Sequence, residues 1–280
     1  MPELPEIQAH AERLTQEFTG ATLTAFKPLT FTALKTAVPR PDGAFGRPLD
    51  RVRHRGKHLL LEFADLTFVV HLMQGGRLKP DEKQSARPRG GIARWVFDGH
   101  PALLLTEAGT ERKAGVWVME PPVEGHGPLE GLGPDADTVA GDTDRLAGVL
   151  AQHSGRIHGV LRDQRVIAGI GRRLANEICH RARLSPFANA AKLGPEDLDA
   201  LASAMDSCLA ESLAYERSRN DMSSSKERPG EVHHREGQSC PVCGDRVRAV
   251  EYVRYTVNYC ATCQTGGKVL ADNTTSRFLR

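Results

Sequence analysis

The stretch MPELPEIQAHAERLTQEFTG, residues 1–20, places two prolines and two glutamates directly ahead of a helical pattern. Apolar side chains recur at steps of three and four residues, at Leu4, Ile7, Ala11, Leu14 and Phe18. Gly20 follows as a stop signal, and Pro5 suits a first helical turn. Because Glu3 and Glu6 would lie at the positive end of the helix dipole, an ordinary helix start is the simplest interpretation.

A helix start does not explain Pro2. A small residue such as proline at position 2 allows the initiator methionine to be removed. The mature chain would then begin with a secondary amine beside two carboxylates on a rigid helix. This is an unusual chemical group for a chain terminus, and it singles out the first six residues.

The chain length, the net charge and the arrangement of the cysteines limit the class of protein. With 280 residues the chain can form two or three domains, and its net charge is only +2. Residues 153–193, however, carry eight Lys or Arg against two acidic residues, which fits nucleic acid or a solvated helix face. The sequence has no membrane-length apolar run or signal peptide, and its cysteines form no secreted disulfide framework. We therefore expect a cytoplasmic, reduced protein that does not contact a membrane.

Two periodicities divide the chain. Between residues 21 and 120, short apolar runs separated by turn residues predict strands of a sandwich or barrel, at 58–63, 67–72, 93–97, 102–106 and 115–119. Residues 121–145 are rich in Pro, Gly and Asp and read as a linker. Four helical segments are then predicted, at 142–153, 156–171, 172–184 and 194–219.

The tail contains paired cysteines. CPVC at 240–243 and CATC at 260–263 are separated by sixteen residues that alternate enough to form a hairpin. Two such pairs suit tetrahedral Zn²⁺, with a redox pair as the alternative. We expect one structural Zn²⁺ on Cys240, Cys243, Cys260 and Cys263, because four cysteine ligands leave no position for a substrate. Cys179, by contrast, is expected to be a buried helix residue.

Other candidate residues carry weaker signals. The turn GIG at 169–171, followed by Arg172, could bind phosphate at a helix N-terminus. The two flanking helices form either a helix–turn–helix variant that contacts DNA or a plain helical hairpin. Lys57 precedes a strand, where a lone lysine is usually solvated, but a second amine near the first could serve the same chemistry. His71 is as likely to be structural as to be a ligand. Gly75 and Gly76 predict a tight turn that presents a glutamine, Gln74, at its tip.

Taken together, these motifs resemble the formamidopyrimidine-DNA glycosylase/endonuclease VIII family of base-excision repair enzymes. The resemblance rests on MPELPE, RGKHLLLE around Lys57, HL…GG at 71–76, LRDQRVIAGIG…ANEI at 161–178 and the four cysteines. It implies an α+β multidomain fold. An N-terminal helix plus β-sandwich would form the catalytic domain over 1–135. A helix–two-turn–helix DNA-binding domain would occupy 136–238, and a zinc ribbon and tail 239–280.

The resemblance also implies a reaction. The amine of Pro2 would attack the sugar of a damaged, flipped-out nucleotide and form a Schiff base, followed by β,δ-elimination. Glu3 would protonate the sugar ring oxygen, Glu6 would orient the N-terminus, and Lys57 would contact the flanking phosphates. The chain would thus be a bifunctional DNA glycosylase and abasic-site lyase. Implied DNA contacts are His71, Gln74, Arg112, Gly171, Arg172 and Arg254.

Several positions depart from the family pattern. Arg172 stands where the family usually has Asn, Gln74 where it has a gap-filling Met, and Ala114 where it has a Phe wedge. Tyr255 stands at the position of the finger arginine, with Arg254 one residue earlier. Arg172, Gln74 and Ala114 favour the alternative, a non-catalytic protein that binds DNA damage or abasic sites on the same scaffold. The intact Pro2, Glu3, Glu6 and Lys57 favour the enzyme.

The same departures shape the expected substrate. The smaller wedge predicts best activity where flipping is already easy: abasic sites, ring-opened purines, oxidised pyrimidines, and bubble or single-stranded DNA. The expected partner is otherwise damaged double-stranded DNA, bound by a monomer. Arg112 would supply what little discrimination of the opposite base there is.

Overall fold

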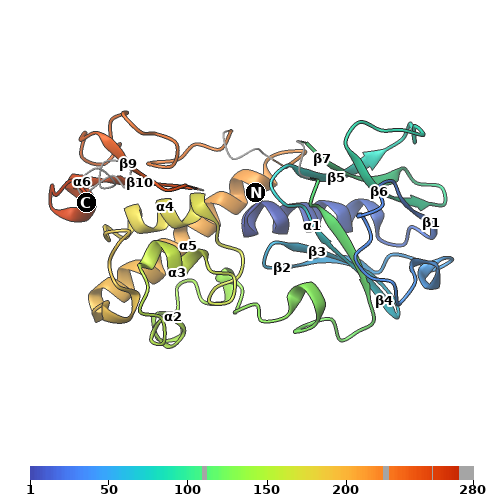
Figure 1. Ribbon diagram of the computed structural model, residues 1–280, viewed down its shortest axis with the longest axis horizontal. Coiled ribbons are helices and arrows are strands. Elements are labelled where there is room, and N and C mark those ends of the chain that lie inside the picture. Colours follow the sequence, from blue (N-terminus) through green and yellow to red (C-terminus); the bar gives the residue numbers. More distant parts are fainter. Residues whose placement is uncertain (109–111, 223–226, 254, 271–280) are drawn as a thin grey trace. The chain divides into compact units, whose positions relative to one another are not determined.

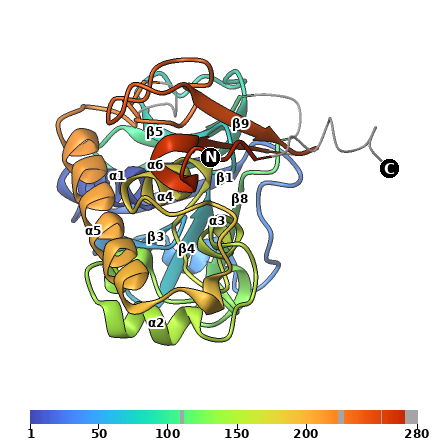
Figure 2. The same ribbon diagram turned by 90° about the vertical axis from the view of Figure 1, so that its left-hand side faces the viewer.

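The computed structural model describes residues 1–108, 112–222, 227–253 and 255–270. These residues form two compact units (Figures 1 and 2). The N-terminal unit comprises Met1–Gly131 with Arg219–Met222, and the C-terminal unit comprises residues 132–218 with the described residues that follow 226. The α+β organisation predicted from the sequence is confirmed, with helix and sheets in the first unit and helices and a cysteine cluster in the second.

The N-terminal unit is a β-sandwich with one helix, α1 (Leu4–Phe18). Its antiparallel sheets have the strand orders β1–β6–β7–β5 and β2–β3–β4–β8. The strands are β1 (Leu23–Pro28), β2 (Arg51–Arg55), β3 (His58–Phe63), β4 (Leu66–His71), β5 (Gly76–Asp81), β6 (Gly91–Phe97), β7 (Ala102–Glu107) and β8 (Gly115–Met119), and 3₁₀ turns lie at η1 (Pro41–Ala44) and η2 (Gly127–Leu129).

One apolar core joins the helix to both sheets. Ile7, Leu14 and Phe18 of α1 are buried with Leu61 of β3 and Trp95 of β6. A single face of α1 therefore contributes to the core, as the steps of three and four in the sequence predicted. This packing fixes the start of α1, and with it the first residues of the chain.

The C-terminal unit begins with helices. They are α2 (Thr143–Leu150), α3 (Ile157–Arg162), α4 (Arg172–Arg181) and the long α5 (Pro195–Arg217), with 3₁₀ turns η3 (Ala136–Thr138) and η4 (Ala190–Lys192). Figure 2 shows α5 in orange, with α2 and α4 also in view. Cys179 of α4 is fully buried, which confirms the prediction for this residue.

The predicted helix over residues 156–171 was wrong beyond Arg162. The side chain of Gln164 donates to the carbonyl oxygens of Arg162 and Ile170, both at 2.8 Å, and accepts from the Gly169 N–H at 3.0 Å. Gly169 has a φ of +102°, which favours glycine. The segment between α3 and α4 is therefore a loop held by one amide side chain.

The predicted hairpin near the end of the chain is confirmed. Strands β9 (Val247–Glu251) and β10 (Thr256–Cys260) pair antiparallel, and α6 (Ala261–Thr265) follows. Among the helices that the structure describes, none has the length and apolarity needed to cross a bilayer.

Candidate active site and metal centre

The first residues of the chain are held against their own helix. The backbone N–H of Glu3 donates to the Glu6 carboxylate at 3.1 Å. Pro2 is buried, and Glu3 and Glu6 are each only 4 % exposed. Helix geometry alone brings positions 3 and 6 together at a first turn. Two carboxyl groups and Pro2 are therefore largely shielded from water at the start of the helix, whereas Met1 ahead of them is 46 % exposed.

Lys57 lies in the tight turn between β2 and β3. Gly56 precedes it with a φ of +55°, as a two-residue hairpin turn requires. Lys57 is only 8 % exposed, so it is not the solvated strand-edge lysine considered as the alternative. The next residue, His58, pairs with His71 across β3 and β4, and the two ring centroids are 4.7 Å apart.

The pKa of His71 reflects its burial and the positive charges near it. Its pKa is lowered to about 4, first by burial and then by the positive charges of Lys57 and of the N-terminal amine. The ring is therefore neutral at pH 7, and its Nδ1 accepts the Met73 N–H at 3.2 Å. The amine of Met1, Lys57 and His71 therefore lie close enough to interact electrostatically, although they come from three different segments.

The turn after β4 is as tight as its glycines predicted. The Gly76 N–H donates to the Leu72 carbonyl at 2.8 Å, and a Cβ on Gly76 would lie 2.0 Å from that oxygen. Gln74 is exposed at the tip. The Ala108 N–H donates to the Gly75 carbonyl at 3.2 Å, so this turn touches the segment after β7. A cavity of about 440 Å³ between them is lined by Gly75, Arg77, Arg89, Gly90, Thr106, Glu107, Ala108 and Arg112.

Ala114 does not occupy a wedge position. It is 1 % exposed and belongs to the apolar core, and its N–H donates to the Glu107 carboxylate at 2.7 Å. Arg112, two residues earlier, is exposed with a φ of +43°. Within this segment, Arg112 is therefore available to a ligand and Ala114 is not.

In the C-terminal unit, the glycine turn leads directly into α4. Gly171 is the N-cap residue, and Arg172 is the first residue of the helix and exposed. No acidic residue lies in the first turn of α4. A helix N-terminus with an exposed arginine at its first position has the positive charge that suits a phosphate.

At the hairpin tip, the structure describes Tyr255 but not the expected DNA contact. Arg254 lies outside the described residues. Tyr255 stacks on Tyr252, with ring centroids 4.6 Å apart, and the guanidinium carbon of Arg162 lies 4.2 Å from the Tyr255 ring centroid. The aromatic residue at this position thus holds an arginine from α3, an arrangement that the sequence did not indicate.

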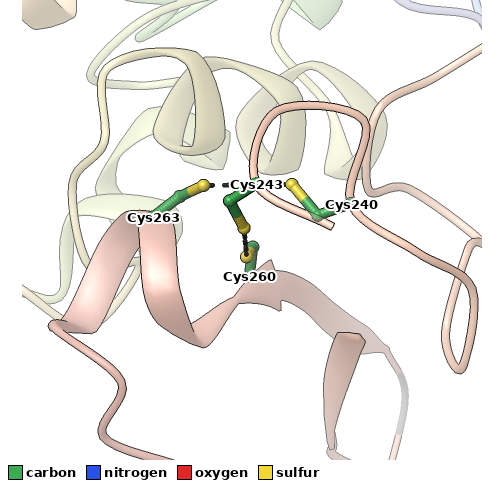
Figure 3. A group of neighbouring side chains, drawn as sticks. All are labelled: Cys240, Cys243, Cys260 and Cys263. Carbon is green, nitrogen blue, oxygen red and sulfur yellow. Dashed lines mark hydrogen bonds between the residues drawn. The ribbon is translucent and has the colours of Figure 1, made fainter. Parts of the chain in front are cut away.

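The four paired cysteines form a cluster (Figure 3). Their Sγ atoms all lie within 4.8 Å of one another, and the Cys243–Cys260 and Cys240–Cys263 pairs are 3.4 and 3.9 Å apart. Four sulfurs at about 2.3 Å from one Zn²⁺ in a tetrahedron would be about 3.8 Å apart. The cluster therefore has the donor set and the size for one metal ion.

The surroundings of Cys240 favour its thiolate form. Its burial raises the pKa, but N–H groups of Cys243 and Val242 and the ring of His180 outweigh burial, so its pKa is lowered overall. Donors directed at a sulfur stabilise the ionised form that binds metal.

Glu177 is a structural residue that the sequence analysis missed. Its carboxylate accepts the backbone N–H groups of Glu231 at 2.7 Å, Val232 at 3.2 Å and His233 at 2.8 Å. It thereby ties α4 to the segment that leads into the first cysteine pair. Its partners lie more than fifty positions away, so no local pattern could have revealed the contact.

Two family models match the chain. Residues 1–115 match the formamidopyrimidine-DNA glycosylase N-terminal domain, and residues 132–224 match the formamidopyrimidine-DNA glycosylase H2TH domain. The matches follow one another in the order of the two units of the fold.

Curated relatives carry the same family name. A formamidopyrimidine-DNA glycosylase from Methylococcus capsulatus is 30 % identical over 94 % of this chain and 100 % of its own length. An uncharacterized formamidopyrimidine-DNA glycosylase-like protein from Mycobacterium tuberculosis is 48 % identical over 53 % of this chain and 94 % of its own length.

Solved structures share the fold. The MutM (Fpg) protein from Thermus thermophilus superposes with a TM-score of 0.80 at 27 % identity, over 96 % of this chain and 100 % of that one. A Lactococcus lactis formamidopyrimidine-DNA glycosylase bound to DNA with an abasic site superposes with a TM-score of 0.81 over 94 % and 99 %, at 17 % identity.

Proposed function

Because this chain belongs to the formamidopyrimidine-DNA glycosylase family, we propose that it is a DNA glycosylase that acts in DNA repair. More specifically, we propose a bifunctional enzyme that excises oxidised or ring-opened bases and then cleaves the abasic site. The observation that carries this proposal is the burial of Pro2, Glu3, Glu6 and Lys57, with the charges of Lys57 and of the terminal amine, here that of Met1, both acting on His71.

The nucleophile in this proposal is the amine of Pro2, once Met1 has been removed. An α-amino group titrates near about pH 8, so a useful fraction is uncharged at neutral pH. Its lone pair attacks C1′ of the damaged nucleotide, the C1′–N bond breaks, and the base leaves with a proton. The amine nitrogen loses its own proton, the C1′–O4′ bond then opens with protonation of O4′, and the nitrogen becomes an iminium cation. The cation acidifies the 2′ position, so loss of that proton expels the 3′ phosphate, and a second elimination expels the 5′ phosphate.

The neighbouring side chains have distinct proposed roles. Glu3 protonates the sugar ring oxygen as the ring opens. Glu6 holds the backbone of Glu3 through their 3.1 Å hydrogen bond, which supports an orienting role. Lys57 binds the phosphates that flank the lesion. His71 is neutral at pH 7 and supplies a hydrogen bond and a ring face rather than a charge.

DNA binding is proposed for both units. In the N-terminal unit, Gln74 and Arg112 stand on adjoining segments and are both exposed, so either side chain could enter the gap that a flipped nucleotide leaves in the DNA. In the C-terminal unit, Gly171 and Arg172 present backbone and guanidinium donors to phosphate. Arg254 remains a proposed contact. We propose that a monomer binds damaged duplex and, because the gap-filling group is polar, bubble or single-stranded DNA.

We propose that the four cysteines hold one structural Zn²⁺. Its chemical contribution would be to join the two cysteine pairs and so fix the hairpin that carries Tyr255. Cys240 and Cys260 are buried, Cys263 is half-buried and Cys243 is exposed, and four cysteine ligands would leave no coordination position for a substrate.

The proposal is tested by separating its two chemical steps. The Glu3→Gln variant should lose excision of a damaged base yet still nick a preformed abasic site, because only excision needs the proton from Glu3. Glu17→Gln, on the exposed side of the same helix, is the matched control and should retain both activities. Equal loss of both activities in Glu3→Gln would contradict the proposed role.

A second candidate function is a non-catalytic protein that binds abasic or damaged sites. The observation in its favour is the burial of Ala114, which removes one group that could fill the vacated stack. A wild-type protein that binds abasic DNA tightly but neither excises nor nicks, with Pro2 at its N-terminus, would select this function.

A further inference from the structure

His180 connects α4 to the cysteine cluster. It lies in the last turn of the helix and is 2 % exposed. Its Nε2 is 3.3 Å from the Sγ of Cys240, and its Nδ1 is 2.8 Å from a carboxylate oxygen of Glu231. The ring thus spans the distance between a metal-ligating sulfur and a carboxylate, with one nitrogen for each.

The carboxylate behind the ring is itself held in place. Arg181 donates to the other oxygen of Glu231 at 3.0 Å, and the backbone N–H of Glu231 donates to Glu177 at 2.7 Å. Because both the carboxylate and the backbone of Glu231 are fixed, the imidazole cannot rotate without losing its Nδ1 partner. The orientation that directs Nε2 at Cys240 is therefore set by residues outside the metal site.

The direction of the Nε2 contact follows from the ligand chemistry. A cysteine that binds a metal is a thiolate, which can only accept a hydrogen bond. Nε2 therefore carries a proton and donates to Cys240. Nδ1 carries one as well, because the Glu231 carboxylate that it faces can also only accept. Four thiolates around one Zn²⁺ leave the centre negatively charged, and a buried N–H donor stabilises that charge where water cannot reach it.

From this geometry we propose that His180 is a positioning residue for the metal centre, which slows metal release by donating a hydrogen bond to Cys240 and joins the centre rigidly to α4. The inference rests on the proposed metal binding and is independent of glycosylase activity. It has a structural consequence, since α4 carries Arg172 at its other end. Ten residues at about 1.5 Å each place the two ends about 15 Å apart on one rigid element.

The test uses three substitutions of His180 that separate the contact made by Nε2, the contact made by Nδ1 and the volume of the ring. His180→Gln carries an amide N–H where Nε2 lies and can still reach Cys240. His180→Asn carries its amide near Nδ1, so it can reach Glu231 but not the sulfur. His180→Phe fills the volume and donates nothing. His153→Phe, in the same unit, is the matched control because its only hydrogen bond among the described residues is through its backbone N–H.

The readout is the rate at which the full-length, zinc-loaded chain releases zinc to excess chelator, followed with a colorimetric zinc indicator. We expect His180→Phe and His180→Asn to release zinc roughly ten-fold faster than wild type, and His180→Gln within about two-fold of it. The absorbance bands of Co²⁺-substituted protein should shift in the same two variants.

Two results would overturn the inference. Equal release rates for wild type and His180→Phe would show that the hydrogen bond does not hold the metal. Equal rates for the Gln and Asn variants would show that contact with Cys240 is irrelevant, even if the Phe variant does not fold. A wild-type chain without zinc would defeat the metal proposal itself, whereas a zinc-loaded chain with unchanged release defeats only the role of His180.

Discussion

Replacement of Glu177 by glutamine should destabilise the C-terminal unit by about 3 kcal/mol. The carboxylate accepts three backbone N–H groups, two on Oε1 and one on Oε2. Glutamine presents an NH₂ group to one of these donors, which costs about 1–3 kcal/mol for a part-buried N–H without an acceptor. The two remaining bonds lose their charged acceptor, at about 0.5–1 kcal/mol each.

The chain offers a convenient assay for this change. Both tryptophans, Trp95 and Trp117, lie in the N-terminal unit, and all four tyrosines lie in the C-terminal unit. Urea unfolding followed by tyrosine circular dichroism should shift to lower denaturant in Glu177→Gln, while tryptophan fluorescence should not shift. Glu211→Gln is the control, because that carboxylate is 64 % exposed in its ion pair with Arg181 and should cost less than about 1 kcal/mol.

The reasoning would be refuted if Glu177→Gln unfolded at the same urea concentration as wild type. The same would follow if it shifted no more than Glu211→Gln. Either result would mean that the three backbone contacts exchange with water and do not anchor the segment before Cys240.

Three further predictions follow from individual residues. Burial, and after it the charge of Arg13, lowers the pKa of His10 to about 4. The neutral ring therefore stabilises the N-terminal unit above about pH 6.5, and about 3 kcal/mol of its unfolding free energy is lost as the pH falls towards 4. In urea titrations followed by tryptophan fluorescence, His10→Gln should show a smaller loss of stability over this pH range. Arg172→Ala should weaken binding to damaged and undamaged duplex by similar factors. It should also reduce the slope of log affinity against log salt concentration by about one, and an unchanged slope would exclude a phosphate contact. Cys260→Ser should abolish zinc binding without moving the tryptophan transition, and full zinc occupancy by metal analysis would contradict the assignment.

The sandwich strands differed in how far the sequence could predict them. Strands β3, β7 and β8 were predicted because continuous apolar runs mark strands that are buried on most of their length. Strand β2 was missed because four of its five residues, Arg51, Arg53, His54 and Arg55, are charged or polar. Strand β5 was missed because its last three residues include Pro80 between a lysine and an aspartate. Backbone pairing with a neighbouring strand, which leaves no local pattern, places both.

The candidate site divides in the same way. Short motifs predicted Pro2, Glu3 and the cysteines as site residues, because in each motif the functional residues lie close together in the sequence. Contacts such as His180 with Cys240 join positions sixty apart, and only tertiary packing reveals them. The extent of α3 was overestimated because apolar spacing continues past Arg162, whereas the side chain of Gln164 replaces the helical hydrogen bonds with its own.

The central claim is that the amine of Pro2 attacks DNA, and reductive trapping tests it most directly. The intact mass of the purified chain is first measured to establish that Met1 has been removed. The protein is then incubated with duplex containing one abasic site in the presence of borohydride, which reduces the iminium to a stable amine. We predict one adduct per chain, mapped by peptide mass spectrometry to the N-terminal peptide at Pro2. An adduct on Lys57 with Pro2 unmodified, or no adduct from chains that begin with Pro2, would contradict the account.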